Sequence, residues 1–428
     1  MGKLALILGS LFVSGITQNC IFGLPVNEKF LQDTLKNQSF DRNISTIILF
    51  NPKQEFSLPV IELGTDNKLE LHFDDLTGSP RQFGYTLKHC DADWTESDME
   101  QQEYVSGYGL GSIENKDQSF NTTREFIHYK LVFPAEECMP QLSGNYVIVI
   151  FENDDPEKII LSRRFFVTES KSTVSASLKR PPNGKFYDTG QQLQVSVQYN
   201  PGEIHDAASD LTTVIMQNNR FDNCLVLTKA FSQSPGNIQY NGADMGIFPG
   251  GNEFRSLDLK SMKYESQQIS AINFQNPYYH VVLKTDEERA SKPYFSNRDL
   301  NGNYFINKEK SQNRHTEADY VYVHFAFRLM YMYSNENIYV TGEFCDWKYS
   351  EQNRMKLDET DGLYKVTLLM KQGLYDYCYF MKNPETGKTD DTAVEGSYYE
   401  TENDYDIFVY FKDRFKGCDL LIGYYSIK

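Results

Sequence analysis

The sequence predicts an all-β protein made of tandem β-sandwich domains. Three observations support this prediction: apolar residues alternate with polar ones in many segments, turn-forming residues separate these segments at short intervals, and aromatic residues, mostly Tyr and Phe, make up 14% of the chain. A period of two buries one face of an antiparallel sheet and leaves the other face wet. Tyr and Phe also favour a pleated, half-buried surface. Many short strands with frequent turns favour sandwiches or barrels.

The predicted strands follow from the alternating segments. Their inward residues are Leu69, Leu71 and Phe73; Phe83, Tyr85 and Leu87; Tyr129, Leu131 and Phe133; Leu193, Val195, Val197 and Tyr199; and Val321, Val323, Phe325, Phe327 and Leu329. The run from Tyr146 to Phe151 is continuously apolar, so we expect a central strand that is covered on both faces. Turn signals at 77–80, 153–156, 181–184 and 249–251 separate the strands.

Composition divides the chain into three predicted domains. With about 100 to 200 residues per domain, 428 residues are enough for two to four. We expect an N-terminal sandwich over 25–169, a second sandwich over 175–295 and a C-terminal one over 318–428. The Ser- and Thr-rich segment 169–177 is interpreted as a linker, and the polar segment 296–319 as a long connection.

Residues 1–19 are typical of a secretory signal peptide. Lys3 supplies the positive end, and the apolar stretch from Leu4 to Val13 has the length of a signal core. This stretch is too short to span a bilayer, which takes about 20 apolar residues. A buried first helix and lipidation at Cys20 are the alternatives. We therefore expect an exported mature chain that is soluble and does not insert into a membrane.

The net charge is strongly acidic. The chain has 42 Lys and Arg against 59 Asp and Glu, a formal charge of −17. This charge excludes the basic footprint of a nucleic-acid-binding protein. An anionic membrane surface would also repel the chain, so the acidic surface is interpreted as one that keeps the protein dissolved.

The seven cysteines show no metal-ligand spacing. No two of them form a CxxC pair, which argues against structural zinc. An exported protein can form disulfides. The odd count and wide spacing favour buried free thiols with at most one bridge, for which Cys345 with Cys378 is the candidate.

No catalytic signature is present in the sequence. It contains neither HExxH nor GxSxG. Gly387-Lys388-Thr389 lacks the first glycine of a phosphate loop, and the segment 299–303 is followed by Tyr304 and Lys310 where a calcium loop needs Gly and Glu. We therefore predict no catalytic residue, no cofactor and no metal site, and expect a non-enzymatic protein that binds other proteins.

The third block has a recognisable pattern of its own. Residues 338–347 read IYVTGEFCDW, and 354–381 continue with a strand, an acidic turn and two strands. This resembles the early-set immunoglobulin-like modules that bind glycogen or starch, in which sugars stack on exposed Trp rings. Trp347 matches the first such ring, but the loop after Met381 carries no second aromatic. Trp347 is therefore interpreted as a structural anchor, and glucan binding is kept as the alternative function.

A second resemblance covers about 25–428. The strings at 83–109, 119–134, 142–155, 162–167, 214–224 and 248–264, in this order, resemble the plug protein of the type IX secretion system of Bacteroidota. The resemblance implies a periplasmic protein at the inner face of the outer membrane. It also implies a partner, the outer-membrane barrel of the translocon, whose periplasmic opening the plug binds and closes.

Two segments of these strings are candidate partner contacts. Trp94 follows a tight acidic turn, and with Tyr104 and Tyr108 in the next loop it would form an aromatic patch; a Trp that caps the core is the favoured interpretation, and the exposed patch the alternative. In the second segment, Gly250 and Gly251 allow positive φ and Asn252 can bond its own backbone. A structural turn is the favoured interpretation here, and a contact loop the alternative.

Overall fold

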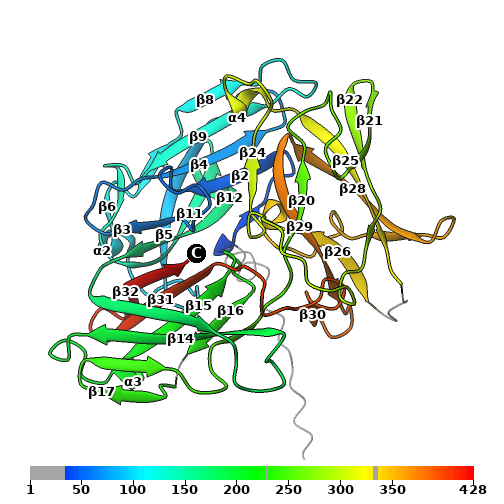
Figure 1. Ribbon diagram of the computed structural model, residues 1–428. Helices are drawn as coiled ribbons and strands as arrows, with labels where there is room; N and C mark the ends of the chain where they lie inside the picture. The colour runs from blue at the N-terminus through cyan, green and yellow to red at the C-terminus, as the bar shows by residue number, and fades with distance from the viewer. Residues whose placement is uncertain (1–33, 228, 331–335) are drawn as a thin grey trace, which may run out of the picture.

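The computed structural model describes residues 34–227, 229–330 and 336–428. Within these ranges the chain folds into three β-sandwiches, coloured in Figure 1 from blue and cyan, through green with two red strands, to yellow and orange. Helices in the described part of the chain are limited to single turns, including α2 (Gln101–Tyr104), α3 (Ala207–Asp210) and α4 (Arg314–Glu317). The predicted all-β sandwich fold is confirmed.

The first sandwich contains two sheets and a small antiparallel pair of strands. One sheet has the order β1-β12-β11-β5-β7, with β3 parallel to β12. Its strands are β1 (Gln38–Ser39), β3 (Val60–Glu62), β5 (Phe83–Cys90), β7 (Leu110–Ser112), β11 (Gly144–Glu152) and β12 (Asp155–Thr168). The facing sheet has the order β2-β4-β9-β8. Its strands are β2 (Ile44–Phe50), β4 (Leu69–Asp75), β8 (Asn115–Gln118) and β9 (Ile127–Phe133), and a separate pair joins β6 (Val105–Gly107) to β10 (Cys138–Pro140).

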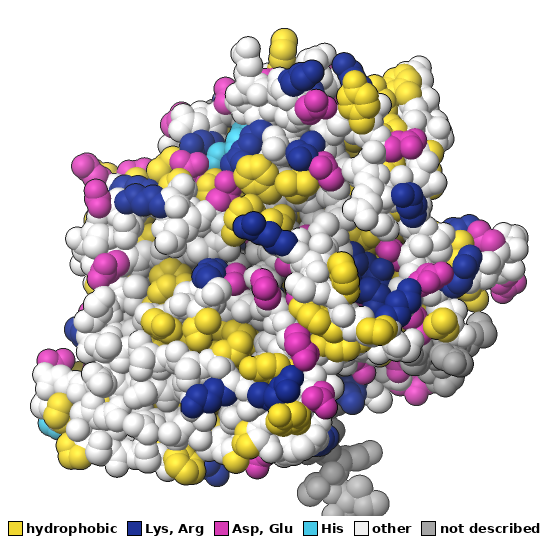
Figure 2. All heavy atoms as spheres, in the orientation of Figure 1, with side chains coloured by type: hydrophobic (Ala, Val, Ile, Leu, Met, Phe, Trp, Pro, Cys, Tyr) yellow, Lys and Arg dark blue, Asp and Glu magenta, His cyan; other side chains and the backbone are white. Residues whose placement is uncertain are grey.

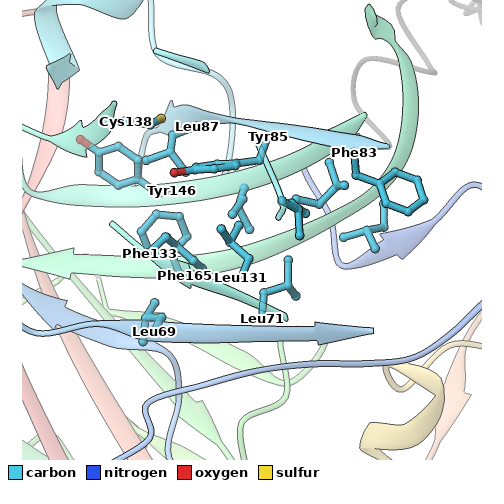
Figure 3. Packing of buried hydrophobic residues seen from close by; sticks show 14 of the residues in the cluster. Leu69, Leu71, Phe83, Tyr85, Leu87, Leu131, Phe133, Cys138, Tyr146 and Phe165 are labelled. Carbon is cyan, nitrogen blue, oxygen red and sulfur yellow. The ribbon is translucent and has the colours of Figure 1, made fainter. Parts of the chain in front are cut away.

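The core of this sandwich follows from the period-two alternation. The inward residues of β4, β5 and β9 meet between the two sheets, as Figure 3 shows. The rings of Phe73 and Tyr129 stack with centroids 5.1 Å apart. β11 is buried along its whole length, as expected for a central strand.

The second sandwich combines the middle of the chain with its C-terminal end. One sheet has the order β13-β14-β18-β17, with β19 beside β14, and the other has the order β16-β15-β31-β32. Their strands are β13 (Ser172–Lys179), β14 (Gly190–Tyr199), β15 (Leu211–Gln217), β16 (Cys224–Leu227), β17 (Ser232–Ser234), β18 (Asn237–Tyr240), β19 (Ile247–Pro249), β31 (Tyr405–Asp413) and β32 (Cys418–Ile427).

The third sandwich combines the segments on either side of residue 300. In one sheet β29 pairs with β20, β24, β26 and β30; the other has the order β21-β22-β25-β28-β27, with β23 beside β25. Their strands are β20 (Arg255–Asp258), β21 (Ile269–Gln275), β22 (Tyr278–Leu283), β23 (Asp286–Glu287), β24 (Tyr304–Ile306), β25 (Tyr320–Arg328), β26 (Asn337–Thr341), β27 (Lys356–Asp358), β28 (Leu363–Lys371), β29 (Gly373–Lys382) and β30 (Thr389–Asp390).

The two later sandwiches exchange strands across the predicted domain boundaries. β31, from the predicted block 318–428, pairs with β15, and β32 extends the same sheet beyond β31, whereas β20 pairs with β29. The predicted blocks 175–295 and 318–428 therefore do not describe these sheets. The predicted linker 169–177 also needs correction, because β13 begins within it. Composition reports only whether a short segment is polar or apolar. It cannot show that strands far apart in the chain pair in one sheet, so it did not reveal these domain boundaries.

Two predictions concern the N-terminal segment and the cysteines. The predicted signal peptide, 1–19, and Cys20 lie outside the described residues. No helix in the described ranges is long and apolar enough to cross a membrane. The six described cysteines are free, so the proposed Cys345–Cys378 bridge is wrong for this structure. Cys345 instead donates to the carbonyl oxygen of Gly342.

Candidate functional site

The first and second sandwiches meet through aromatic and aliphatic side chains, and we call this contact the apolar joint. Its buried residues are Leu58, Phe166, Met216, Phe408, Tyr410 and Leu421. Phe166 on β12 stacks on Phe408 of β31 with centroids 4.2 Å apart. The outward faces of two sheets thus bury each other, which the hydrophobic effect favours.

Trp94 belongs to this joint. Its ring packs edge-on against Phe166 and Phe221, with centroid distances of 5.3 and 5.5 Å. The Arg164 guanidinium lies over its face at 4.2 Å. Trp94 is half-buried between two sandwiches and is not the exposed ring that the aromatic-patch prediction requires.

Tyr104 and Tyr108 have opposite environments. Tyr104 is 5% exposed and packs into the first core, so its ring is not available to a partner. Tyr108 is 90% exposed, between Gly107 and Gly109, which both have positive φ. Leu110 and Met139 are also exposed, at 45% and 39%, on strands beside the same loop. We call Tyr108, Leu110 and Met139 the Tyr108 patch.

The turn at Gly250, Gly251 and Asn252 is held inside the molecule. A side chain on Gly250 would place its Cβ 1.9 Å from the carbonyl oxygen of Tyr398. Gly251 has a φ of +65° and accepts from the Tyr398 amide at 2.8 Å. Asn252 donates to the carbonyl oxygen of Glu395 at 2.7 Å. These contacts tie the turn to the segment 395–403, as a structural turn would.

Trp347 is also a packing residue. It is 6% exposed, and its ring lies between Phe254 and Phe380 with Arg220 at 4.8 Å. A Cβ on Gly302 would lie 2.5 Å from the same ring. Stacking of a sugar needs an open aromatic face, so this position does not support glucan binding.

The first and third sandwiches meet through buried polar side chains, and we call this contact the polar joint. Lys371 Nζ on β28 lies 2.5 Å from Asp74 Oδ2 on β4, and both side chains are 1% exposed. The Tyr320 hydroxyl donates to the same carboxylate at 2.6 Å. Burial alone would raise the pKa of Asp74, but the charge of Lys371 and the hydrogen bond from His128 lower it. Asp319 on the third sandwich accepts from the Thr123 amide of the first at 2.7 Å.

Three histidines lie at this joint. His72 on β4 and His128 on β9 face outward from the first sandwich, and α4 of the third places His315 against them. The His72 and His315 rings stack at 4.4 Å. Burial lowers the pKa of His72 to about 4 and that of His315 to about 2.

A cleft of about 550 Å³ lies where the three sandwiches meet. It is lined by Ile47 to Phe50 from the first sandwich, Phe221 from the second and Tyr304 to Ile306 from the third. Glu343 also lines it, and burial raises the pKa of this carboxyl to about 7. Figure 2 shows hydrophobic side chains together with Lys and Arg near the middle of this face.

Sequence reasoning did not find the polar joint or the cleft. One signal was available: Glu70, His72 and Asp74 occupy alternate positions of β4, on the face opposite Leu71 and Phe73. Three polar residues on one outward face are normal for a wet sheet. These three residues are unusual only because the third sandwich covers them and shields them from water.

Comparison with known proteins shows which family has this architecture. The family model described as "Type 9 secretion system plug protein 1st domain" matches residues 44–169, which correspond to the first sandwich. The crystal structure of a hypothetical protein from Parabacteroides merdae is 30% identical, with a TM-score of 0.87, and the match covers 92% of this chain and 98% of that one. The chain belongs to the type 9 secretion system plug protein family.

This assignment confirms the resemblance inferred from the sequence strings. No curated protein matches the chain. The collagen adhesin of S. aureus aligns at 10% identity with a TM-score of 0.11, too low for structural comparison. Proteins of the plug family are components of type IX secretion and are not enzymes. Membership in this family associates the chain with that system in the cell envelope.

Proposed function

We propose that this plug-family protein is periplasmic, binds the periplasmic opening of the outer-membrane translocon barrel and closes it when no substrate is engaged. The observation that carries the proposal is the match of residues 44–169 to the first domain of the plug family. The protein works by binding, without making or breaking a covalent bond.

A body that closes a wide channel has to be stiff, and the two joints support this requirement. The apolar joint stacks Phe166 on Phe408, and the polar joint pairs Asp74 with Lys371. Close-packed interiors resist deformation. Contacts between the second and third sandwiches add to this, such as the ion pair of Arg220 with Asp391 at 2.9 Å. Three sandwiches joined in this way would move as one body.

Tyr108, the centre of the Tyr108 patch, is the exposed residue of the predicted contact set. A stable interface buries about 1,600 Å² in total, and aromatic anchors carry much of its energy. Tyr108 is exposed on a loop that the hydrogen bond from the Gly109 amide to the carbonyl oxygen of Glu137 holds in place, so less conformational freedom would be lost on binding. Trp94 and the Gly250 turn instead pack against other segments of the protein.

The test is capture from native membranes. Tagged full-length protein, expressed in its own host, should co-purify with the outer-membrane barrel of the type IX system in mild detergent. Deletion of the gene should make the outer membrane leaky to large solutes. Tyr108→Ala should weaken the capture, and Tyr187→Ala, which removes a half-exposed ring from the second sandwich, is the matched control. Failure of the wild-type protein to capture the barrel would contradict the proposal.

A further inference from the structure

The three histidines of the polar joint lie close enough to share one ligand. One ring nitrogen from each of His72, His128 and His315 lies within 4.8 Å of the others. Two of the rings come from neighbouring strands of the first sandwich, and the third comes from α4 beside the third sandwich. Three imidazoles with one open position are a common protein site for zinc.

The hydrogen bonds of His72 and His128 determine which nitrogens are free. His72 Nε2 lies 3.0 Å from Glu70 Oε2, and His128 Nδ1 lies 2.7 Å from Asp74 Oδ1. A carboxylate only accepts hydrogen bonds, so each of these ring nitrogens carries its proton and donates. In the neutral rings the other two nitrogens, His72 Nδ1 and His128 Nε2, then carry lone pairs.

These two lone pairs face each other. His72 Nδ1 and His128 Nε2 are 3.0 Å apart. Two lone pairs at this distance repel unless a cation lies between them. A proton would serve, but it would leave a positive charge on a buried ring, since both His72 and His128 are buried. A metal ion satisfies both nitrogens at once.

We propose that His72, His128 and His315 form a binding site for a divalent transition metal, with Zn²⁺ as the best fit. His72 contributes Nδ1, His128 contributes Nε2 and His315 contributes one ring nitrogen, while water fills the fourth position. Zn–N bonds of about 2.0–2.1 Å with tetrahedral angles place two nitrogens roughly 3.3 Å apart. The present spacing of 3.0 Å therefore needs only a small adjustment.

The surroundings of the histidines match those of known metal sites. Metal-bound histidines commonly donate their second N–H to a carboxylate, which fixes the ring and raises its basicity. Glu70 and Asp74 already occupy these positions. His315 lines the central cleft, which gives an ion a route from solvent. The Arg314 Nε–H donates to His315 Nε2 at 3.2 Å, so binding through that atom requires Arg314 to move away.

A metal here would join two sandwiches. His72 and His128 belong to the first and His315 to the third, so the ion would fasten the polar joint. A ligand that binds the folded state alone raises its stability by mass action. Metal binding here would be a property of the isolated chain, so it does not depend on the proposed role in secretion.

The test is calorimetric titration of the full-length chain with zinc chloride, after treatment with a chelator and dialysis. We expect one Zn²⁺ per chain and a higher melting temperature in its presence. Glu70→Gln should weaken binding about 10- to 100-fold, as loss of outer-shell partners does. His315→Ala should weaken it at least as much. His205→Ala, which removes an exposed histidine elsewhere, should bind as the wild type does.

A second measurement guards against loss of folding. Circular dichroism should show that Glu70→Gln and His315→Ala keep the β signature, and His315 is the less buried member of the triad. Co²⁺ in place of Zn²⁺ should give the visible bands of a tetrahedral site in the wild type and lose them in His315→Ala. The proposal is overturned if the wild type binds no stoichiometric zinc. It is equally overturned if the folded Glu70→Gln and His315→Ala variants bind zinc as tightly as the wild type.

Discussion

The apolar joint and the polar joint attach the same first sandwich to its two neighbours by different physics. The apolar joint buries rings such as Phe166 and Phe408. The polar joint buries Asp74, Lys371 and three histidines, whose hydrogen bonds have fixed directions. Both joints cover the outward face of a sheet. Only the polar joint depends on each of its hydrogen-bonding and charged partners being present.

This difference predicts how each joint fails. Contact between apolar groups is non-directional and scales with buried area, so a lost side chain leaves a cavity whose cost depends on how far the neighbours relax. A buried charge without its partner keeps its full desolvation cost. The apolar joint should therefore tolerate changes of pH and conservative substitutions, whereas the polar joint should set the orientation of the third sandwich and respond to both.

The largest effect is expected at Lys371. Lys371→Met leaves Asp74 charged and buried without its cation, and breaking a buried pair in this way costs about 3–5 kcal/mol. Urea denaturation should show the lower stability. Lys88→Met, which removes a partly exposed partner of Glu96, is the matched control and should cost about 0–1 kcal/mol. Equal effects of the two substitutions would remove the distinction between the joints.

At the apolar joint, Phe166→Ala should destabilise the protein by about 3–4 kcal/mol because it opens a cavity against Phe408. Phe166→Leu should recover much of this loss, because contact between apolar groups needs no fixed direction. Phe120→Ala, which removes a ring that is 69% exposed, should change the free energy of unfolding by less than about 0.5 kcal/mol. A Leu substitution as damaging as Ala would show that this joint is also directional.

A pH response is also expected at the cleft where the three sandwiches meet, and Glu343 is the group to test. Its folded-state pKa of about 7 lies above the ordinary value of 4.5, so the folded protein holds a proton that the unfolded chain has released. Stability should therefore fall as pH rises from about 4.5 to about 7, by about 1–3 kcal/mol. Glu343→Gln should flatten this slope in urea titrations at a series of pH values. An unchanged slope in Glu343→Gln would refute the assignment, and Glu351→Gln is the exposed control.

The smallest effect on stability is expected at Tyr108, which belongs to neither joint. Tyr108→Ala removes a ring that is 90% exposed, so the melting temperature should stay within the scatter of repeated wild-type scans. Capture of the barrel should weaken in the same variant. A clear drop in melting temperature would show that the ring supports the fold, and the patch would then lose its role as a partner contact.

The sequence predicts the strands well because alternation reports burial locally. Leu69, Leu71 and Phe73 are fully buried, as their spacing indicates. The alternation from Val321 to Leu329 likewise marks the central strand β25, which ends at Arg328. These predictions need no knowledge of the rest of the chain.

The environments of single residues could not be predicted in the same way. Trp94 and Trp347 are covered by side chains from distant segments, Phe166 and Phe221 in one case and Phe254 and Phe380 in the other. The pairing of β31 with β15 likewise depends on which sheet edge is free once the other strands have formed. The histidine cluster needs both the first sandwich and α4, so no local spacing could indicate it.

The most direct test of the central claim, that this stiff body uses its exposed surface to bind the secretion barrel, is photo-crosslinking in cells. A photoreactive residue in place of Tyr108 should give a cross-linked product that contains the outer-membrane barrel of the type IX system. That product should be lost in cells that lack the barrel. If the residue at Tyr108 reacts only with other components, or gives the same products without the barrel, the account of this surface is contradicted.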